Sequence, residues 1–236
     1  MQLDYAWIST TRRIFGPDTG TPPARLTGNH QLVNVKWTAD PRLTVGGYFY
    51  SLDFDQAAAL SSQTAGGFIN GKLALDPVTL DYRLEAARQT DHAGNPVDFD
   101  ADYSLFELGL TVAGVRLGLA QETLGADGSA GVAMQTPLAT LHAFQGWSDK
   151  FLATPANGIE DTYVSLGSTV AGIKLLAIWH EYDSDRGSAD LGSELNLLAS
   201  RQFAKRYTLT AKYADFDADT FSNDTRKVWL MAEAAF

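Results

Sequence analysis

Apolar and polar residues alternate with a period of two along most of this chain. The clearest example is the run 78–90, because successive side chains of a strand point to opposite faces. One face of the run is apolar and consists of Val78, Leu80, Tyr82, Leu84 and Ala86. The other face is mostly polar and consists of Thr79, Asp81, Arg83, Glu85 and Ala87. This pattern predicts an amphipathic β-strand with one face in apolar surroundings.

About eleven further stretches resemble this run, which predicts an all-β chain of about twelve strands. They are 2–13, 29–38, 43–53, 68–75, 100–112, 115–122, 160–170, 173–183, 191–202, 207–217 and 226–236. The run 43–53 is rich in aromatic residues on both faces, so its faces cannot be assigned. A length of 236 residues suits one large β domain.

Short and long connections alternate between these strands. Tight turns are predicted at 39–42, 76–77, 113–114, 171–172 and 203–206, and long loops include 16–28 and 55–66. Short turns at one end and long loops at the other are typical of outer-membrane barrels. We therefore predict one transmembrane, antiparallel, up-and-down β-barrel domain spanning 1–236, with short periplasmic turns and long extracellular loops. A soluble β-barrel or sandwich is the alternative.

Composition narrows the function classes. The formal net charge is −10, and no basic cluster offsets it, which argues against a nucleic-acid partner. The chain has no cysteine, so thiol chemistry is excluded. No apolar run reaches the length of a membrane helix. Met1 leads straight into a strand pattern without an export signal, so we expect a fragment or a trimmed N-terminus.

The last strand, 226–236, ends the chain on an aromatic residue. Val228, Leu230, Ala232 and Ala234 share its apolar face with the terminal Phe236. A closing strand that ends in phenylalanine resembles those of bacterial outer-membrane barrels, where this residue is read by the barrel-assembly machinery. We therefore expect that machinery to be a partner of the chain through Phe236.

Four phrases of the chain resemble the alginate-export family of outer-membrane porins. They are RIFGPD at 13–18, TPLATLHAFQGWSDKFLATP at 136–155, IKLLAIWHEYDSD at 173–185 and YTLTAKYADFDAD at 207–219. The resemblance implies passive transport without a cofactor, and it places this chain in the C-terminal portion of larger proteins. The chain is then either a barrel that closes near twelve strands or a fragment with open edges. The even strand count favours closure.

The polar strand faces predict the lining of a pore. The candidates are Lys36, Lys72, Asp81, Arg83, Glu85, Glu107, Arg116, Glu122, Lys174, Glu194, Lys212 and Glu233. Because both signs of charge occur, we predict a channel for small hydrophilic solutes or ions in the outer membrane, not a dedicated alginate conduit. The row Asp81, Arg83 and Glu85 is either an ion filter or a salt-bridged polar core. The alternatives are a soluble ligand-binding barrel and an outer-membrane enzyme on the same scaffold.

The segment 123–158 joins two strands at the extracellular end and is too long for an ordinary connection. It carries too many apolar side chains to lie in water, and lipid does not accept irregular backbone. We therefore predict that it folds into the barrel mouth as a constriction. The candidate residues there are His142, Trp147, Asp149 and Lys150. The alternative is a loop that lies on the rim.

Other candidate chemistry is weak. No Ser/His/Asp order accompanies His142, and His180 is interpreted as a residue of the membrane rim. The acidic phrases 98–102, 183–190 and 215–219 lack the spacing of a calcium loop, so no metal site is predicted. An interfacial aromatic belt is expected from Tyr5, Trp7, Trp37, Tyr48, Tyr50, Trp179, Tyr207, Tyr213 and Trp229.

Overall fold

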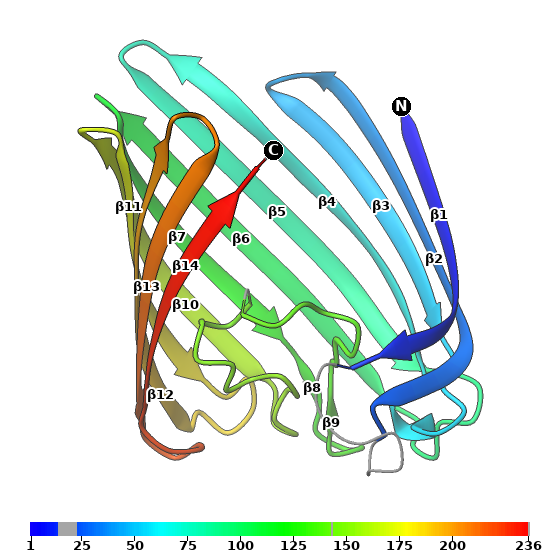
Figure 1. Cartoon of the computed structure of the whole chain (residues 1–236). Coiled ribbons are helices and arrows are strands. Elements are labelled where there is room, and N and C mark those ends of the chain that lie inside the picture. The colour runs from blue at the N-terminus through cyan, green and yellow to red at the C-terminus, as the bar shows by residue number, and fades with distance from the viewer. Residues whose placement is uncertain (14–22, 143, 236) are drawn as a thin grey trace.

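The computed structural model describes residues 1–13, 23–142 and 144–235. Twelve antiparallel strands form one sheet in chain order (Figure 1). They are β1 (Gln2–Arg12), β2 (Arg25–Asp40), β3 (Leu43–Leu52), β4 (Ser62–Leu75), β5 (Val78–Asp91), β6 (Asp100–Val112), β7 (Val115–Leu124), β10 (Ile159–Val170), β11 (Ile173–Asp183), β12 (Asp190–Phe203), β13 (Tyr207–Ala218) and β14 (Thr225–Ala234). A short hairpin, β8 (Ala126–Asp127) and β9 (Val132–Ala133), lies between β7 and β10, and η1 (Ala58–Leu60) follows β3. The antiparallel all-β prediction is confirmed.

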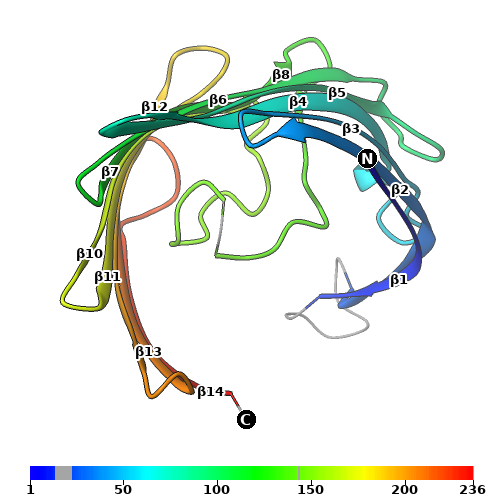
Figure 2. The ribbon, with the colours of Figure 1, turned by 90° about the horizontal axis from the view of Figure 1, so that it is seen from above.

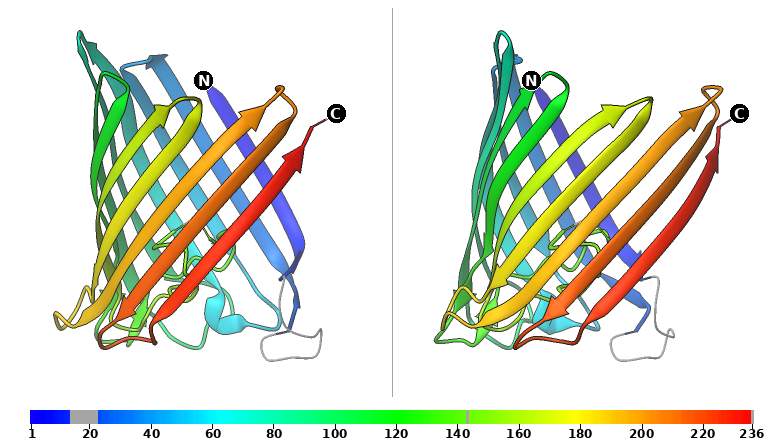
Figure 3. Two further views of the ribbon diagram at one scale, coloured as in Figure 1. Left: turned by 60° about the vertical axis from the view of Figure 1, so that its left-hand side comes forward. Right: turned by 90° about the vertical axis from the view of Figure 1, so that its left-hand side faces the viewer.

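The sheet is tilted and strongly curved, with one concave and one convex face (Figures 2 and 3). Its order begins at β1 and ends at β14, and no pairing joins these two strands in the described part of the chain. The closure near twelve strands that the even count favoured is therefore not present in this structure. Tight turns lie at one end of the sheet, where the N- and C-termini also lie (Figure 1). Phe236 lies outside the described residues.

The convex face is apolar. Antiparallel pairing places Leu108, Leu119, Val164 and Trp179 side by side across β6, β7, β10 and β11. Large side chains stay exposed there, including Leu230, which is 83% exposed. The register puts the residues that alternation assigns to lipid on this face, namely Leu80, Tyr82, Leu84, Leu108, Leu110, Leu117, Leu119, Leu209, Ala211 and Leu230. Such a continuous apolar surface suits a hydrocarbon environment.

The predicted loop 55–66 is wrong over its second half, because β4 already begins at Ser62. Ser62 pairs with Leu52 on one side and with Asp91 on the other. The stretch 62–67 consists of small and polar residues, so it shows no apolar alternation. Its Gly66 leaves room for a neighbour, because an added Cβ would lie 2.5 Å from the Tyr48 hydroxyl oxygen. The predicted loop 16–28 likewise ends earlier, since β2 begins at Arg25.

Three members of the expected aromatic belt lie on the concave face instead. The Tyr48 hydroxyl donates to Glu85 at 2.7 Å, and the Tyr50 hydroxyl donates to Asn34 at 2.8 Å. The Trp229 ring lies 4.2 Å from the ring of His142. Aromatic residues occupy both faces of β3, and Trp229 is the aromatic residue of β14, so residue type alone could not assign them. The alternation, not the aromatic character, decides which face each takes.

Candidate functional site

All twelve residues predicted to line a pore share the concave face. Cross-strand pairs establish this placement, for example Lys72 with Asp81 and Arg83 with Glu107. The same face contacts the segment folded inside the sheet. The full set is Lys36, Lys72, Asp81, Arg83, Glu85, Glu107, Arg116, Glu122, Lys174, Glu194, Lys212 and Glu233. Their role in conduction stays a prediction.

The row Asp81, Arg83 and Glu85 is internally paired. The Arg83 guanidinium donates to Glu85 from Nε at 2.9 Å, and Arg116 donates to Asp81 from Nε at 3.1 Å. The Arg116 and Asp81 side chains remain 44% and 33% exposed on the concave side. The row therefore presents matched charges to the interior instead of one sign.

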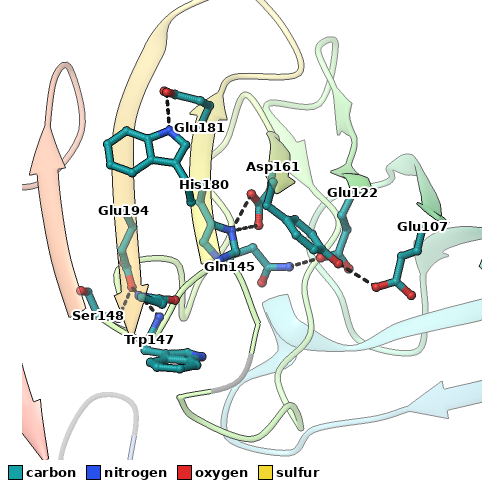
Figure 4. A network of polar contacts seen from close by, with 12 residues as sticks. Glu107, Glu122, Gln145, Trp147, Ser148, Asp161, His180, Glu181 and Glu194 are labelled. Atoms are coloured by element: carbon teal, nitrogen blue, oxygen red, sulfur yellow. Dashed lines mark hydrogen bonds and ion pairs between the residues drawn. The ribbon is translucent and has the colours of Figure 1, made fainter. Parts of the chain in front are cut away.

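Tyrosine hydroxyls bind the carboxylates of neighbouring strands further along this wall, and Figure 4 shows where the carboxylates Glu107 and Glu122 lie. Tyr163 donates to Glu107 at 2.9 Å, and Tyr103 donates to Glu122 at 2.6 Å. Hydrogen bonds to charged groups are stronger than those between neutral ones. These bonds fix the carboxylates against the wall. Neither tyrosine was among the predicted lining residues, although each alternates with outward-facing residues.

His180 does not belong to the membrane rim, because its side chain is buried on the concave face. Its Nδ1 lies 2.9 Å from Asp161 Oδ1, and both side chains are almost fully buried. Trp179 pairs with the outward-facing Val164 and donates to Glu181 at 2.7 Å. The alternation after Trp179 was the signal that could have placed His180 inward.

Residues 134–142 and 144–158, here termed the inward segment, lie inside the curve of the sheet (Figure 2). Gln135 and Gln89 bind reciprocally: the Gln135 N–H donates to the Gln89 side chain at 2.8 Å, and the Gln89 amide donates to the Gln135 carbonyl at 2.9 Å. Leu138 packs against a small apolar cluster on β2, β3 and the connection that follows β3. Phe151 packs against Tyr182 with ring centres 4.7 Å apart. The segment thus crosses the concavity from β2 and β5 to β11.

The four residues predicted for a constriction all lie in this segment. His142 Nδ1 is 2.9 Å from the carbonyl oxygen of Trp147. Asp149 forms an ion pair with Lys227 of β14 at 3.2 Å. Lys150 Nζ donates to the Ser222 hydroxyl at 3.2 Å. A positive charge on the wall, that of Lys227, therefore balances the negative charge of Asp149. That these four residues narrow a passage through the channel stays a prediction.

No group of three or more His, Cys, Asp or Glu side chains in 1–13, 23–142 and 144–235 is placed to hold a metal ion. Over the same ranges, no helix has the length and apolar character needed to cross a membrane.

Solved structures resemble this chain, whereas no protein-family model and no curated protein matches it. Acinetobacter baumannii OccAB4 matches with a TM-score of 0.69 at 12% identity, over 89% of this chain and 54% of that one. The outer membrane protein OprD of Pseudomonas aeruginosa matches with a TM-score of 0.67 at 11% identity, over 88% and 59%. The chain has the fold of OprD. Pseudomonas aeruginosa OccK11 matches with a TM-score of 0.66 at 14% identity, over 90% and 60%. The chain spans between 54% and 60% of the length of these three proteins.

The resemblance to the alginate-export family is wrong. The similar structures are OprD and Occ proteins, and no family model or curated protein supports alginate export. Phrases such as YTLTAKYADFDAD at 207–219 mainly record the alternation of β13 and the acidic end of that strand. Any curved membrane sheet imposes such a pattern, so the phrases do not identify a family.

Proposed function

We propose that this chain forms the wall of a porin-like channel in the bacterial outer membrane, for passive diffusion of small hydrophilic solutes or ions. The observation that carries the proposal is the division of one curved sheet into an apolar convex face and a polar concave face. A transmembrane barrel needs this division, because its outside meets lipid and its inside meets water.

A soluble ligand-binding barrel fits the convex face poorly. Leu119, Leu209 and Leu230 are 51%, 52% and 83% exposed there, within one continuous apolar surface. Soluble monomers rarely expose apolar patches of that extent. The same leucines are favourable in a bilayer.

The concave face supports a general channel. Its arginines pair with Asp81 and Glu85, so no unbroken row of one charge favours a single class of ion. The inward segment, residues 134–142 and 144–158, occupies part of the interior, which favours small solutes over polymers. An enzyme on this scaffold lacks support, since the His180–Asp161 pair is buried away from a substrate. The ring of Tyr163 packs beside it, with its centre 5.1 Å from that of the His180 ring.

Lipid imposes one further condition on such a channel. Unpaired backbone groups cost several kcal/mol each in hydrocarbon, so the edges of β1 and β14 must both be paired in the membrane. Recognition of Phe236 by the barrel-assembly machinery is part of the same proposal.

The test is reconstitution of the chain from detergent into planar bilayers. We expect a band that shifts on heating before electrophoresis, as folded barrels show, and discrete steps of ion current. Heat-unfolded protein from the same preparation is the control and should give no steps. A protein that stays monodisperse without detergent and gives no current would refute the proposal.

A further inference from the structure

We propose that Glu194 is the positioning residue of the inward segment: it fixes residues 146–149, here termed the tip, against the channel wall and so sets the conductance. The conductance part of this inference rests on the proposed function. The placement of the tip does not, and it can be tested separately.

The Glu194 carboxylate is fully buried on β12 and gathers three donors on one oxygen. Its Oε1 accepts the backbone N–H groups of Trp147 at 2.6 Å and of Ser148 at 2.9 Å (Figure 4). The Asn196 side-chain amide donates to the same oxygen at 2.5 Å. Two consecutive backbone groups of the tip are therefore held by one charged acceptor.

Gly146 allows this close approach. Its φ is +82°, a left-handed conformation that suits glycine. A Cβ there would lie 2.6 Å from Glu194 Oε2 and 2.4 Å from the Tyr182 hydroxyl oxygen. The carboxylate thus lies directly against the backbone of the tip, where no side chain could fit.

Two further strands hold the tip from the other side. Lys227 of β14 donates to the Ser148 carbonyl at 2.6 Å and pairs with Asp149. Lys212 of β13 lies over the Trp147 ring, with Nζ 4.7 Å from the ring centre. The tip therefore bridges β12, β13 and β14.

The backbone in and directly before the tip adopts unfavourable φ values. Gln145, which directly precedes the tip, and Asp149, its last residue, have φ values of +49° and +56°, which non-glycine residues adopt at a cost. Such conformations persist only where surrounding contacts impose them. Loss of the Glu194 acceptor would also leave the buried N–H groups of Trp147 and Ser148 unpaired. The tip should then leave the wall.

Substitutions at Glu194 separate its role as an acceptor from its charge. Glu194→Gln keeps the shape and an acceptor oxygen, whereas Glu194→Leu keeps only the bulk. We expect Glu194→Leu to change the single-channel conductance and add fluctuations, and Glu194→Gln to resemble the unmodified protein. Glu181→Leu is the matched control, since it removes an exposed carboxylate from the convex face of β11, outside the predicted lining of the pore.

A labelling assay tests the tip without current. The chain has no cysteine, and Ser148 is only 2% exposed, so Ser148→Cys is a unique buried reporter. We expect an impermeant maleimide to label the Ser148→Cys variant slowly, both on its own and in combination with Glu194→Gln. Labelling should be at least about tenfold faster with Glu194→Leu, because two hydrogen bonds to a charged group are lost.

The outcomes are distinct. Equal labelling in the Leu and Gln backgrounds would overturn the positioning role, even if the channel conducts. Faster labelling only with Glu194→Leu, without current in the unmodified protein, would support the positioning role and refute the channel. If Glu194→Leu gives no heat-shifted band, Gly146→Ala replaces it. Faster labelling in that variant supports the positioning role of Glu194, and unchanged labelling overturns it.

Discussion

Arg116 of β7 reaches across β6 to Asp81 of β5, and their ion pair lies directly over Gly109. Two contacts join the side chains, at 3.1 Å from Nε and 2.5 Å from Nη2. A Cβ on Gly109 would lie 2.3 Å from the Asp81 carboxylate and 2.4 Å from the Arg116 guanidinium. The glycine in the middle strand therefore makes room for the pair.

Gly109→Ala should destabilise the folded chain by about 1–3 kcal/mol, the usual cost of overpacking. The added methyl group must displace the ion pair from the wall. Gly167→Ala is the matched control on the same face, because its Cβ would meet nothing closer than 3.8 Å. The measurement is the temperature at which the electrophoretic band shifts. Equal shifts in both variants would show that Gly109 does not support the pair.

Arg116→Glu should move the ion preference toward cations. The change leaves Asp81 beside a second carboxylate on the concave face, and charges in a narrow pore act at short range. Arg83→Glu should have the same sign, because it leaves Glu85 without its partner. The measurement is the reversal potential under a salt gradient. Arg226→Glu is the control, since Arg226 lies on the convex face and is 77% exposed. Unchanged potentials in both concave variants would place these arginines outside the conducting path.

Alternation predicted the strands and their faces wherever large apolar residues mark one face. Leu209 and Leu230, for example, both lie on the convex face, as the alternation of their strands predicts. This holds because register is set by burial of one face. It failed at 62–67, where small residues give no contrast, and at Tyr48, where both faces of the strand are aromatic.

The site could be predicted only in part, because its contacts join residues far apart in the chain. Alternation can place Glu194 inward, but not bring it to Trp147, which is 47 positions away. Likewise, the pairing of Asp81 with Arg116 depends on the register of three strands. Short phrases could not separate one family of barrels from another, since lipid and water impose the same alternation on all of them.

Leu209→Arg should destabilise the membrane-inserted chain by about 2–4 kcal/mol if the residue lies near the bilayer midplane. Leu209 is on the convex face, where a charge would meet lipid. Thr210→Arg is the matched control, because the next residue along β13 faces the interior. Stability is measured by denaturant titration in lipid vesicles. A neutral Leu209→Arg with a damaging Thr210→Arg would reverse the assignment of the two faces.

The hairpin of β8 and β9 should open at acid pH. Hydrogen bonds from the Ser129 hydroxyl and from the backbone N–H groups of Ala130 and Ser129 lower the pKa of Asp127. The ionised form therefore stabilises the hairpin above the ordinary carboxyl pKa, and this contribution is lost as pH falls through the lowered value. Hydrogen-exchange protection at Ala130, corrected for intrinsic rates, should fall over that range. Asp127→Asn is the control and should show no such step; an identical step there would exclude Asp127.

Removing the inward segment should widen the passage. Deletion of 136–153 joins Gln135 to Thr154, and these residues already bind each other: the Thr154 N–H donates to the Gln135 side chain at 3.1 Å. The Gln135 amide in turn donates to the Thr154 carbonyl at 2.9 Å, so the two ends of the deletion already lie close together.

The deletion takes out Trp147 and Phe151, which occupy the concave side. We therefore expect a clear increase in single-channel conductance in planar bilayers, with the heat-shifted band retained as evidence of folding. Glu194→Leu should give a smaller change than the deletion, because it releases the tip but leaves the segment in the interior. A folded deletion variant with unchanged conductance would show that the segment lies outside the path of the ions.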